Sequence, residues 1–421
     1  MRVGPSCVIE SPLNSGWKRL AAEVTYESKD HPSETIWFDF EPAASDGIAA
    51  TGNPWAALLT PLAMTLGEDL YVADPIDPLL LENIHELIDV WKSWNETLHR
   101  IQVHAPLDTS SDLLPSNRVA AFFSGGLDSF FTALRNEHAT RLKPAIDDLV
   151  TVWGFDIPVD RRDDYAIART SLTDAAGKLG KRHLTVATNL RETLLDRLCS
   201  WEKLMHGPAM TAIAVAMDRQ YGRFLIPSSY AYIDNMPYGS HPVTDALFST
   251  RRMRVLHDGC GYKRIPKAEL VATSPIAHTH LRVCWEGGRA DNCCRCTKCL
   301  RTMVVFEALD ALNKFTVFDK DAFSPEILRG WHVRRESEFK PLELLVPYIK
   351  ARNKSELLEA LTTCLARSRK LNQRIEFARR FINLPLLGGL ARRVIWRLEN
   401  QGQLYAHTAT KHSEHPKARK A

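Results

Sequence analysis

The spacing of apolar and polar residues changes twice along the chain. In the first 114 residues, short alternating stretches typical of strands are mixed with stretches whose apolar residues recur every three or four positions, as on one face of a helix. The strand-like stretches are residues 22–28, 34–40 and 69–74, and the helical ones are residues 53–66 and 78–98. This mixture predicts an α+β N-terminal domain over residues 1–114.

From Arg118 the pattern becomes a regular alternation of apolar strands and helices. The predicted strands are residues 119–123, 148–156, 183–190, 222–229 and 251–257, and the predicted helices are residues 128–138, 163–179, 191–205 and 208–221. Apolar strands that alternate with helices indicate a parallel sheet covered on both faces. We therefore expect a mainly parallel α/β sheet from residue 118 onward, with ligands beyond the carboxyl ends of its strands.

Beyond residue 319 the chain is helical and increasingly basic. Residues 366–421 contain 13 Lys and Arg against 3 Asp and Glu, although the whole chain has a net charge of only +4. This composition predicts a helical basic C-terminal extension over residues 319–421, which could bind nucleic acid or another acidic partner. A solvated basic face packed on the body of the protein is the alternative, and a membrane-surface helix is a weaker one. The arginines in question are Arg379, Arg380, Arg392, Arg393 and Arg397.

Length and composition narrow the class of protein. A chain of 421 residues with 45% hydrophobic and 25% charged residues is typical of two or three ordinary globular domains. No apolar run approaches the roughly 18 residues of a membrane span. Residues 1–18 also lack the continuous apolar segment of a secretory signal, so we expect none. We therefore expect a cytoplasmic protein without a transmembrane segment.

A polar hexapeptide separates the first strand of the alternating region from its helix. It reads Ser124, Gly125, Gly126, Leu127, Asp128, Ser129. Glycines permit the abrupt turn, and such a loop directs backbone N–H groups and a helix N-terminus at one point, where oxyanions bind. Two serines add hydroxyl groups, and Asp128 could help to hold Mg²⁺. A tight turn in which Asp128 and Ser129 merely cap the helix is the alternative.

The hexapeptide matches neither of two common phosphate-binding motifs, because it lacks the lysine of G-x-x-x-x-G-K-[ST] and the spacing of G-x-G-x-x-G. Ser-Gly-Gly-x-Asp-Ser after a strand instead resembles the pyrophosphate loop of the N-type ATP pyrophosphatase (PP-loop) superfamily. That resemblance implies an adenine nucleotide alpha hydrolase-like fold and cleavage of ATP between its α- and β-phosphates. It also implies that ATP and its pyrophosphate bind to Ser124, Gly125, Gly126, Leu127, Asp128 and Ser129.

Five cysteines are clustered between residues 284 and 299. Cys284, Cys293, Cys296 and Cys299 have the spacing C-x₈-C-x₂-C-x₂-C, and four thiolates complete the tetrahedral shell of a structural Zn²⁺. An Fe–S cluster is the alternative for four cysteines. Cys294 would break the C-x₂-C spacing and is interpreted as a spectator. His278 and His280 are close enough in sequence to replace a cysteine, although such histidines are more often incidental.

This cysteine spacing after a pyrophosphate loop resembles 7-cyano-7-deazaguanine synthase, a branch of the superfamily that serves queuosine biosynthesis. The resemblance implies a doubly wound, mainly parallel α/β sheet over residues 118–312, with a small four-cysteine zinc appendage. The segment Pro266–Val271, read PKAELV, is similar to a segment of that family that precedes its cysteines. The resemblance makes Lys267 a candidate phosphate contact and, with Asp128, a candidate catalytic residue. The family segment that holds the deazaguanine has a loose counterpart in residues 239–249, and the candidate acceptor-binding residues are His241, Pro242 and Asp245.

The resemblance implies an ATP-dependent ligase that forms C–N bonds. A carboxylate such as 7-carboxy-7-deazaguanine would be adenylated with release of pyrophosphate and then converted to an amide or a nitrile, with ATP and Mg²⁺ required and Zn²⁺ structural. A PP-loop enzyme that modifies tRNA or protein, by thiolation, amidation or deazaguanine conjugation, is one alternative. A non-catalytic ATP-binding module is another. Cys199 and Cys260 are conceivable sulfur carriers, although single cysteines in such elements are more often core residues.

Overall fold

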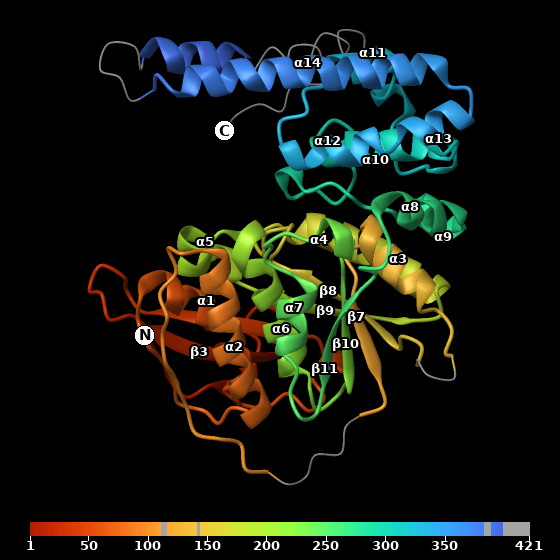
Figure 1. Ribbon diagram of the computed structural model, residues 1–421. Helices are drawn as coiled ribbons and strands as arrows, with labels where there is room; N and C mark the ends of the chain where they lie inside the picture. The colour runs from red at the N-terminus through yellow and green to blue at the C-terminus, as the bar shows by residue number, and fades with distance from the viewer. Residues whose placement is uncertain (111–115, 141–143, 383–388, 399–421) are drawn as a thin grey trace, which may run out of the picture. The chain divides into compact units, whose positions relative to one another are not determined.

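The computed structural model describes residues 1–110, 116–140, 144–382 and 389–398 (Figure 1). The chain divides into two compact units, unit 1 over Met1–Asp291 and unit 2 over Asn292–Ala421. None of the helices among the described residues combines the length and the apolar character needed to cross a membrane.

Unit 1 is a mixed α/β unit built on a mostly parallel central sheet. The strands of this part are β7 (Val119–Phe122), β8 (Asp148–Trp153), β9 (Arg182–Thr188), β10 (Arg223–Pro227) and β11 (Arg254–Asp258). Their spatial order is β9-β8-β7-β10-β11, and all four neighbouring pairs are parallel. The chain therefore runs from β7 toward one edge and then crosses back to β10 on the other side. Such a reversal beside β7 is where open α/β sheets bind ligands.

The N-terminal segment extends this same sheet. Its strands are β1 (Arg2–Val3), β2 (Cys7–Glu10), β3 (Lys18–Thr25), β4 (Glu34–Phe40), β5 (Leu70–Val72) and β6 (Val103–His104). β4 pairs antiparallel with β9, with Phe38 opposite Thr188, and the result is one 11-stranded sheet. The sequence predicted a separate domain over residues 1–114. The structure divides the chain differently, because apolar residues of β3 and β4 share one core with residues of β7 to β10.

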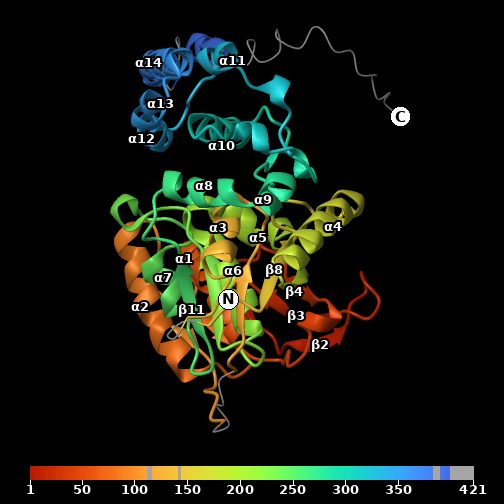
Figure 2. The same ribbon diagram turned by 90° about the vertical axis from the view of Figure 1, so that its right-hand side faces the viewer.

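Helices cover both faces of the sheet (Figure 2). One face carries α1 (Asn53–Leu66), α2 (Pro78–Trp94), α6 (His206–Ala216) and α7 (Pro242–Leu247); the other carries α3 (Leu127–Arg135) and α4 (Arg162–Lys178), next to α8 (Arg264–Thr273) and α9 (Pro275–His280). β7 is buried along its whole length, and its Ala120 and Phe122 pack in the same core as α1 and α6. The apolar character of β7 follows from this burial on both faces.

One predicted helix is broken in the structure. Residues 191–205 were expected to form a single helix, but they contain a 3₁₀ turn, Leu190–Glu192, then α5 (Leu194–Leu198) and a π-helical turn, Trp201–Met205. Cys199 and Ser200 between them are extended, and the Ser200 hydroxyl caps the last turn by accepting from the N–H of Lys203. Serine favours this capping geometry over a helix interior, which accounts for the break.

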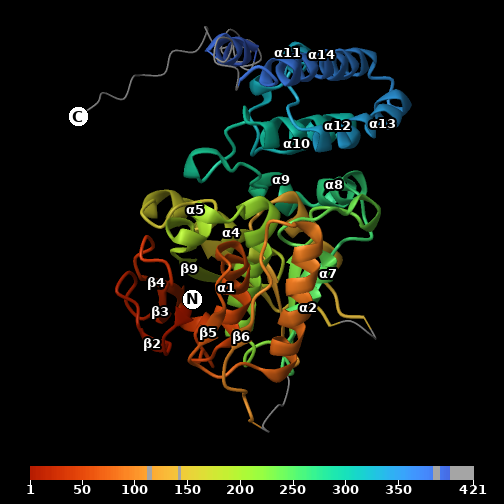
Figure 3. The ribbon, with the colours of Figure 1, turned by 60° about the vertical axis from the view of Figure 1, so that its left-hand side comes forward.

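Unit 2 is helical in its described part. It contains α10 (Thr297–Ala308), α11 (Pro325–Gly330), α12 (Glu336–Glu343), α13 (Val346–Ala351) and α14 (Ser355–Arg379), with a further helix over residues 389–398. α11 and α14 lie side by side (Figure 3). The sequence placed α10 in the sheet domain and began the extension at residue 319. In the structure α10 belongs to unit 2, where its Arg301 pairs with Glu338 of α12 and its Glu307 pairs with Lys354, the N-cap of α14.

Short 3₁₀ helices complete the described chain. They are Pro42–Ala44, Tyr232–Asp234, Glu286–Gly288, Leu312–Lys314 and Lys320–Ala322. Residues 383–388 and 399–421 of the predicted basic extension lie outside the described residues, as do residues 111–115.

Candidate functional site

The loop after β7 depends on Gly125 for its shape. Gly125 has a φ of +72°, in the region that side-chain-bearing residues rarely adopt, and a Cβ there would lie 2.7 Å from Cδ2 of Leu172. Its carbonyl oxygen accepts a hydrogen bond from the N–H of Arg282 at 2.8 Å. Gly126 differs, because it is extended and a Cβ there would lie 3.2 Å from the Ser124 hydroxyl and 3.7 Å from the carbonyl oxygen of Arg282. The first glycine is thus the conformationally demanding one.

The two serines of the hexapeptide hold the turn together. The Ser124 Oγ accepts from the N–H of Gly126 at 3.3 Å, and the buried Ser129 donates its hydroxyl to the Gly126 carbonyl at 3.0 Å. Leu127 anchors the start of α3 because its side chain is buried. The loop therefore presents the N-terminus of a nine-residue helix, the positive end of its dipole, at the carboxyl end of β7.

Lys267 connects this loop to the end of β10, the strand beside β7 in the sheet. Its side chain is 1% exposed, and its Nζ donates to the carbonyl oxygen and the Oγ of Ser228, at 2.5 and 2.8 Å, and to Oδ1 of Asp128 at 3.3 Å. Ser228 directly follows β10 and Asp128 lies in the first turn of α3. One buried ammonium group thus bridges the carboxyl ends of β7 and β10, where the strand order reverses.

Two cationic side chains and one carboxylate lie close together beside the loop. Arg264, three residues before Lys267 on α8, places its NH1 3.1 Å from Oδ2 of Asp128. Each carboxylate oxygen of Asp128 therefore faces one cation. Burial lowers the pKa of Lys267; Asp128 opposes that effect, and Arg264 adds to it. A buried lysine that pairs with Asp128 and lies close to a second cation is a position at which an added anion would be stabilised.

The candidate acceptor residues form the start of α7. His241 is the N-cap, and its Nδ1 accepts from the N–H of Val243 at 3.1 Å, while its ring lies edge-on to Trp94. Pro242 occupies the first helical position, which suits its fixed φ. Asp245 is fully buried and accepts from the Ser240 hydroxyl at 2.6 Å. The contacts of these three residues are those of a capped and anchored helix.

Asp245 also holds a histidine that sequence reasoning did not single out. The Nδ1 of His257, on β11, lies 2.6 Å from Oδ2 of Asp245. Burial lowers the pKa of His257, but the hydrogen bonds with Asp245 and with Cys260 outweigh burial and raise it to about 9. The imidazole is therefore protonated at neutral pH and forms a buried ion pair. Cys260, one of the conceivable sulfur carriers, is buried beside it.

This ion pair should make stability fall at alkaline pH. Because the pKa of His257 is raised from 6.5 to about 9 in the folded protein, its contribution is complete below pH 6.5 and is lost as the pH rises through 9. The melting temperature should therefore drop more between pH 7 and pH 10 in the native protein than in His257→Gln. Thermal melts of both proteins across this range measure the difference, and equal drops would contradict the assignment.

Cys284, Cys293, Cys296 and Cys299 come together into a group that can hold a metal ion such as zinc. Their four Sγ atoms all lie within 4.8 Å of one another. Cys293 Sγ accepts from the N–H of Cys296 at 3.3 Å, and Cys296 Sγ accepts from the N–H of Cys299 at 3.4 Å. The hydrogen bonds from Cys299 lower the pKa of Cys296 to about 5 even though burial raises it. Thiolates are the form in which cysteines bind metals.

Cys294, which was predicted to be a spectator, and the two nearby histidines lie outside this group. Cys294 has a φ of +57°, and its Sγ accepts from the N–H of Asp319 at 3.2 Å. His278 contacts the carbonyl oxygen of Ala272, and the Nε2 of His280 lies 2.7 Å from Asp174. The group that can hold a metal is therefore the predicted set of four cysteines.

Three residues of the site were missed from sequence: Ser228, Arg264 and His257. Ser228 and His257 lie at the carboxyl ends of strands that were predicted, so their position after or at the end of a parallel strand was a usable signal. Arg264 is three residues from Lys267, which places both on one side of a helix.

We compared this chain with protein-family models, with curated proteins and with solved structures. No family model, no curated protein and no solved structure matches it.

Proposed function

We propose that unit 1 binds ATP at the loop Ser124–Ser129 and transfers its AMP moiety to a carboxylate. The observation that carries this proposal is the bridge between Asp128 and the buried Lys267 at the reversal of the strand order. A glycine loop, a helix N-terminus and two cations at one point suit a group with several negative charges, such as pyrophosphate. The resemblance of the hexapeptide to the PP-loop superfamily supports the same choice of ligand.

The proposed first step needs no side-chain nucleophile. A carboxylate oxygen of the substrate attacks the α-phosphorus, the bond from this phosphorus to the bridging oxygen breaks, and pyrophosphate leaves with the electron pair. ATP enters as its Mg²⁺ complex, so that Mg²⁺ arrives with the substrate. Lys267 and Arg264 neutralise the charge that develops on the leaving group, and Asp128 holds both of them at the loop.

The second step consumes the acyl adenylate. Ammonia or an amine attacks the acyl carbon, the C–O bond to AMP breaks, and the amine loses a proton to water, which gives an amide. A second ATP would adenylate the oxygen of a primary amide with release of pyrophosphate, and loss of AMP and of both nitrogen-bound protons to water would then give a nitrile. These are C–N bond-forming ligase reactions, and we assign the chain to a cytoplasmic enzyme of this type.

The cysteine spacing supports a 7-carboxy-7-deazaguanine-like carboxylate as the acceptor. In this proposal the four cysteines hold a structural Zn²⁺. Four sulfurs about 2.3 Å from one ion in a tetrahedron lie about 3.8 Å apart, which fits sulfur atoms that all lie within 4.8 Å of one another. An Fe–S cluster places several metal ions and sulfides between its cysteines and needs a wider set.

Product analysis tests the proposal. The full chain is incubated with Mg²⁺, ATP labelled on the α-phosphate, ammonium and 7-carboxy-7-deazaguanine. We expect AMP and pyrophosphate, formed in equal amounts and only when the carboxylate is present. ADP as the nucleotide product would refute the assignment, and tight ATP binding without turnover of any carboxylate would favour the non-catalytic ATP-binding module.

A second candidate function is modification of a nucleic acid by the same adenylation chemistry. The observation that favours it is the basic surface of unit 2 at the end of α14, where arginines from separate segments converge. AMP formation that requires tRNA and not the free deazaguanine would support this alternative.

A further inference from the structure

A second site lies in unit 2, along the C-terminal half of α14. The structure has a groove of about 690 Å³ there, and four arginines are among the residues that line it. These arginines are Arg334, Arg369, Arg379 and Arg380, and Glu376 is the single carboxylate of the lining. Arg334 precedes α12, whereas the other three come from α14 and its C-cap. Cations from two separate segments thus converge on one concavity.

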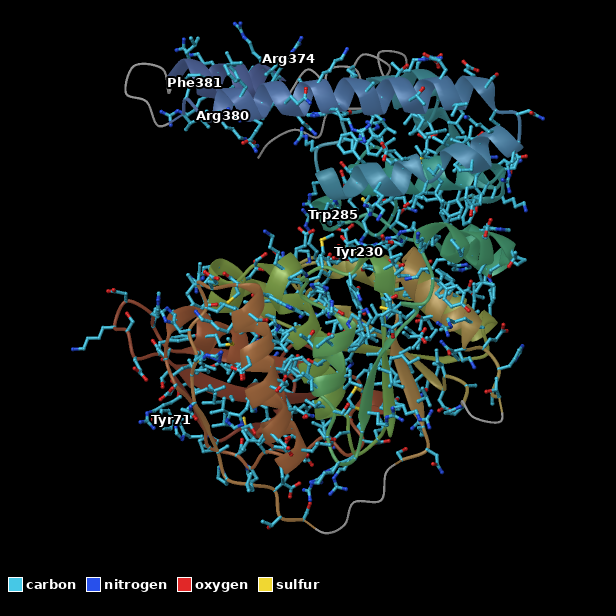
Figure 4. All side chains as sticks on the ribbon, viewed as in Figure 1. Tyr71, Tyr230, Trp285, Arg374, Arg380 and Phe381 are labelled. Atoms are coloured by element: carbon cyan, nitrogen blue, oxygen red, sulfur yellow. The ribbon has the colours of Figure 1, made fainter. Side chains whose placement is uncertain are left out.

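The helix dipole does not account for this gathering of charge. Cations in the last turn of a helix are stabilised by the dipole, an effect that fades within that turn. Arg379 is in the last turn of α14, but Arg369 lies ten positions earlier and Arg334 is on another segment. Arg369 pairs with Glu343, whereas Arg380, labelled in Figure 4, has no acidic partner among the residues that the structure describes. The groove therefore holds a surplus of positive charge.

The sign of the charge differs between the two units. Unit 2 contains 25 Lys and Arg against 13 Asp and Glu, and unit 1 contains 29 against 37. A polyanionic partner would therefore be attracted to unit 2, which carries the net positive charge, and not to unit 1. The side chains of the groove lining that carry a permanent positive charge are all arginines. The planar guanidinium donates two parallel hydrogen bonds to a phosphate, which the lysine ammonium cannot do.

Aromatic and amide groups beside the arginines narrow the class of polyanion. Phe377 lines the groove and is 61% exposed, with its ring 5.2 Å from that of Phe381 at an angle of 62°. Exposure of a phenylalanine costs free energy unless a partner covers it, and an unpaired base stacks on such a ring. Gln373, also in the lining, is exposed and carries both a donor and an acceptor.

We propose that this groove binds single-stranded nucleic acid, with phosphates on the arginines and a base on Phe377. A concave wall fits a flexible polyanion that can enter it, whereas a lipid bilayer presents a flat surface. A duplex has its bases already stacked and offers none to Phe377. The site lies entirely in unit 2, so this proposal can be tested independently of the ATP chemistry proposed for unit 1.

Fluorescence polarisation with labelled single-stranded RNA of about 20 nucleotides tests the proposal on the full chain. We expect binding that weakens with rising KCl, because phosphate contacts release counterions. Arg380→Gln should weaken binding severalfold and make the slope of log K against log[KCl] shallower by about one. Phe377→Leu keeps an apolar side chain but removes the ring; it should weaken binding about tenfold and leave the slope unchanged.

Lys350→Gln is the matched control, because it removes one exposed positive charge of unit 2 from α13, away from the groove lining. It should bind like the native chain, and thermal melts should show all three variants folded. Three results would overturn the proposal: no binding of single-stranded RNA or DNA at 100 mM KCl, equal loss in Lys350→Gln and Arg380→Gln, or full displacement of RNA by vesicles of anionic phospholipid with no effect of Phe377→Leu. A failure here leaves the AMP and pyrophosphate assay unaffected.

Discussion

Lys267→Met is expected to reduce pyrophosphate release from ATP by a factor of at least about 100. Methionine has nearly the length of lysine and suits a buried position, but it removes the cation that bridges Asp128 and Ser228. A preorganised donor directed at developing charge commonly contributes two to three orders of magnitude to a rate. The measurement is the rate of pyrophosphate formation at saturating ATP and carboxylate.

Lys263→Met is the matched control for this variant. Lys263 is the N-cap of α8, one turn before Lys267, and its side chain is partly exposed. It should retain the native rate. Loss of a buried hydrogen-bonded amine also destabilises unit 1, so the melting temperature of both variants must be recorded. A folded Lys267→Met protein that releases pyrophosphate at the native rate would contradict the proposed role.

Sequence patterns that are local could be read well. The five strands β7 to β11 were predicted because each is a short apolar run followed by a turn, and their mostly parallel arrangement is confirmed. The four cysteines were predicted from their spacing, and they do come together. Both signals lie within a few residues, where the chain itself limits the geometry.

Features that depend on distant residues could not be read. The pairing of β4 with β9 joins Phe38 to Thr188, and no property of either strand identifies its partner. The bridge from Lys267 to Ser228, and the meeting of Arg334 with α14, likewise result from packing. The sequence also did not distinguish the two glycines of the loop, because only the backbone shows that Gly125 has a positive φ.

The metal prediction has the second large expected effect. Cys296→Ser should lose the bound metal, because Cys296 is a candidate ligand; a serine can still cap the start of α10, so any loss of stability in this variant comes from the missing ligand. Apparent binding free energies of structural zinc are about 10–16 kcal/mol in zinc-finger peptides, as large as the whole stability of an ordinary domain, about 5–15 kcal/mol. The loss of one of the four ligands should therefore destabilise the folded state of unit 2 and not only lower its affinity for zinc. The native chain should contain about one zinc per molecule by elemental analysis.

Cys294→Ser provides the comparison that separates ligation from burial. Cys294 is buried like Cys296, but its sulfur contacts the N–H of Asp319 and the carbonyl oxygen of Asn292 and is not one of the group of four. A serine hydroxyl can accept the same hydrogen bond, so this variant should keep its zinc and nearly its melting temperature. Because both variants replace a buried thiol by a hydroxyl, only ligation predicts a difference between them. Equal metal content in Cys294→Ser and Cys296→Ser, or a native chain that is folded and free of metal, would contradict the zinc site.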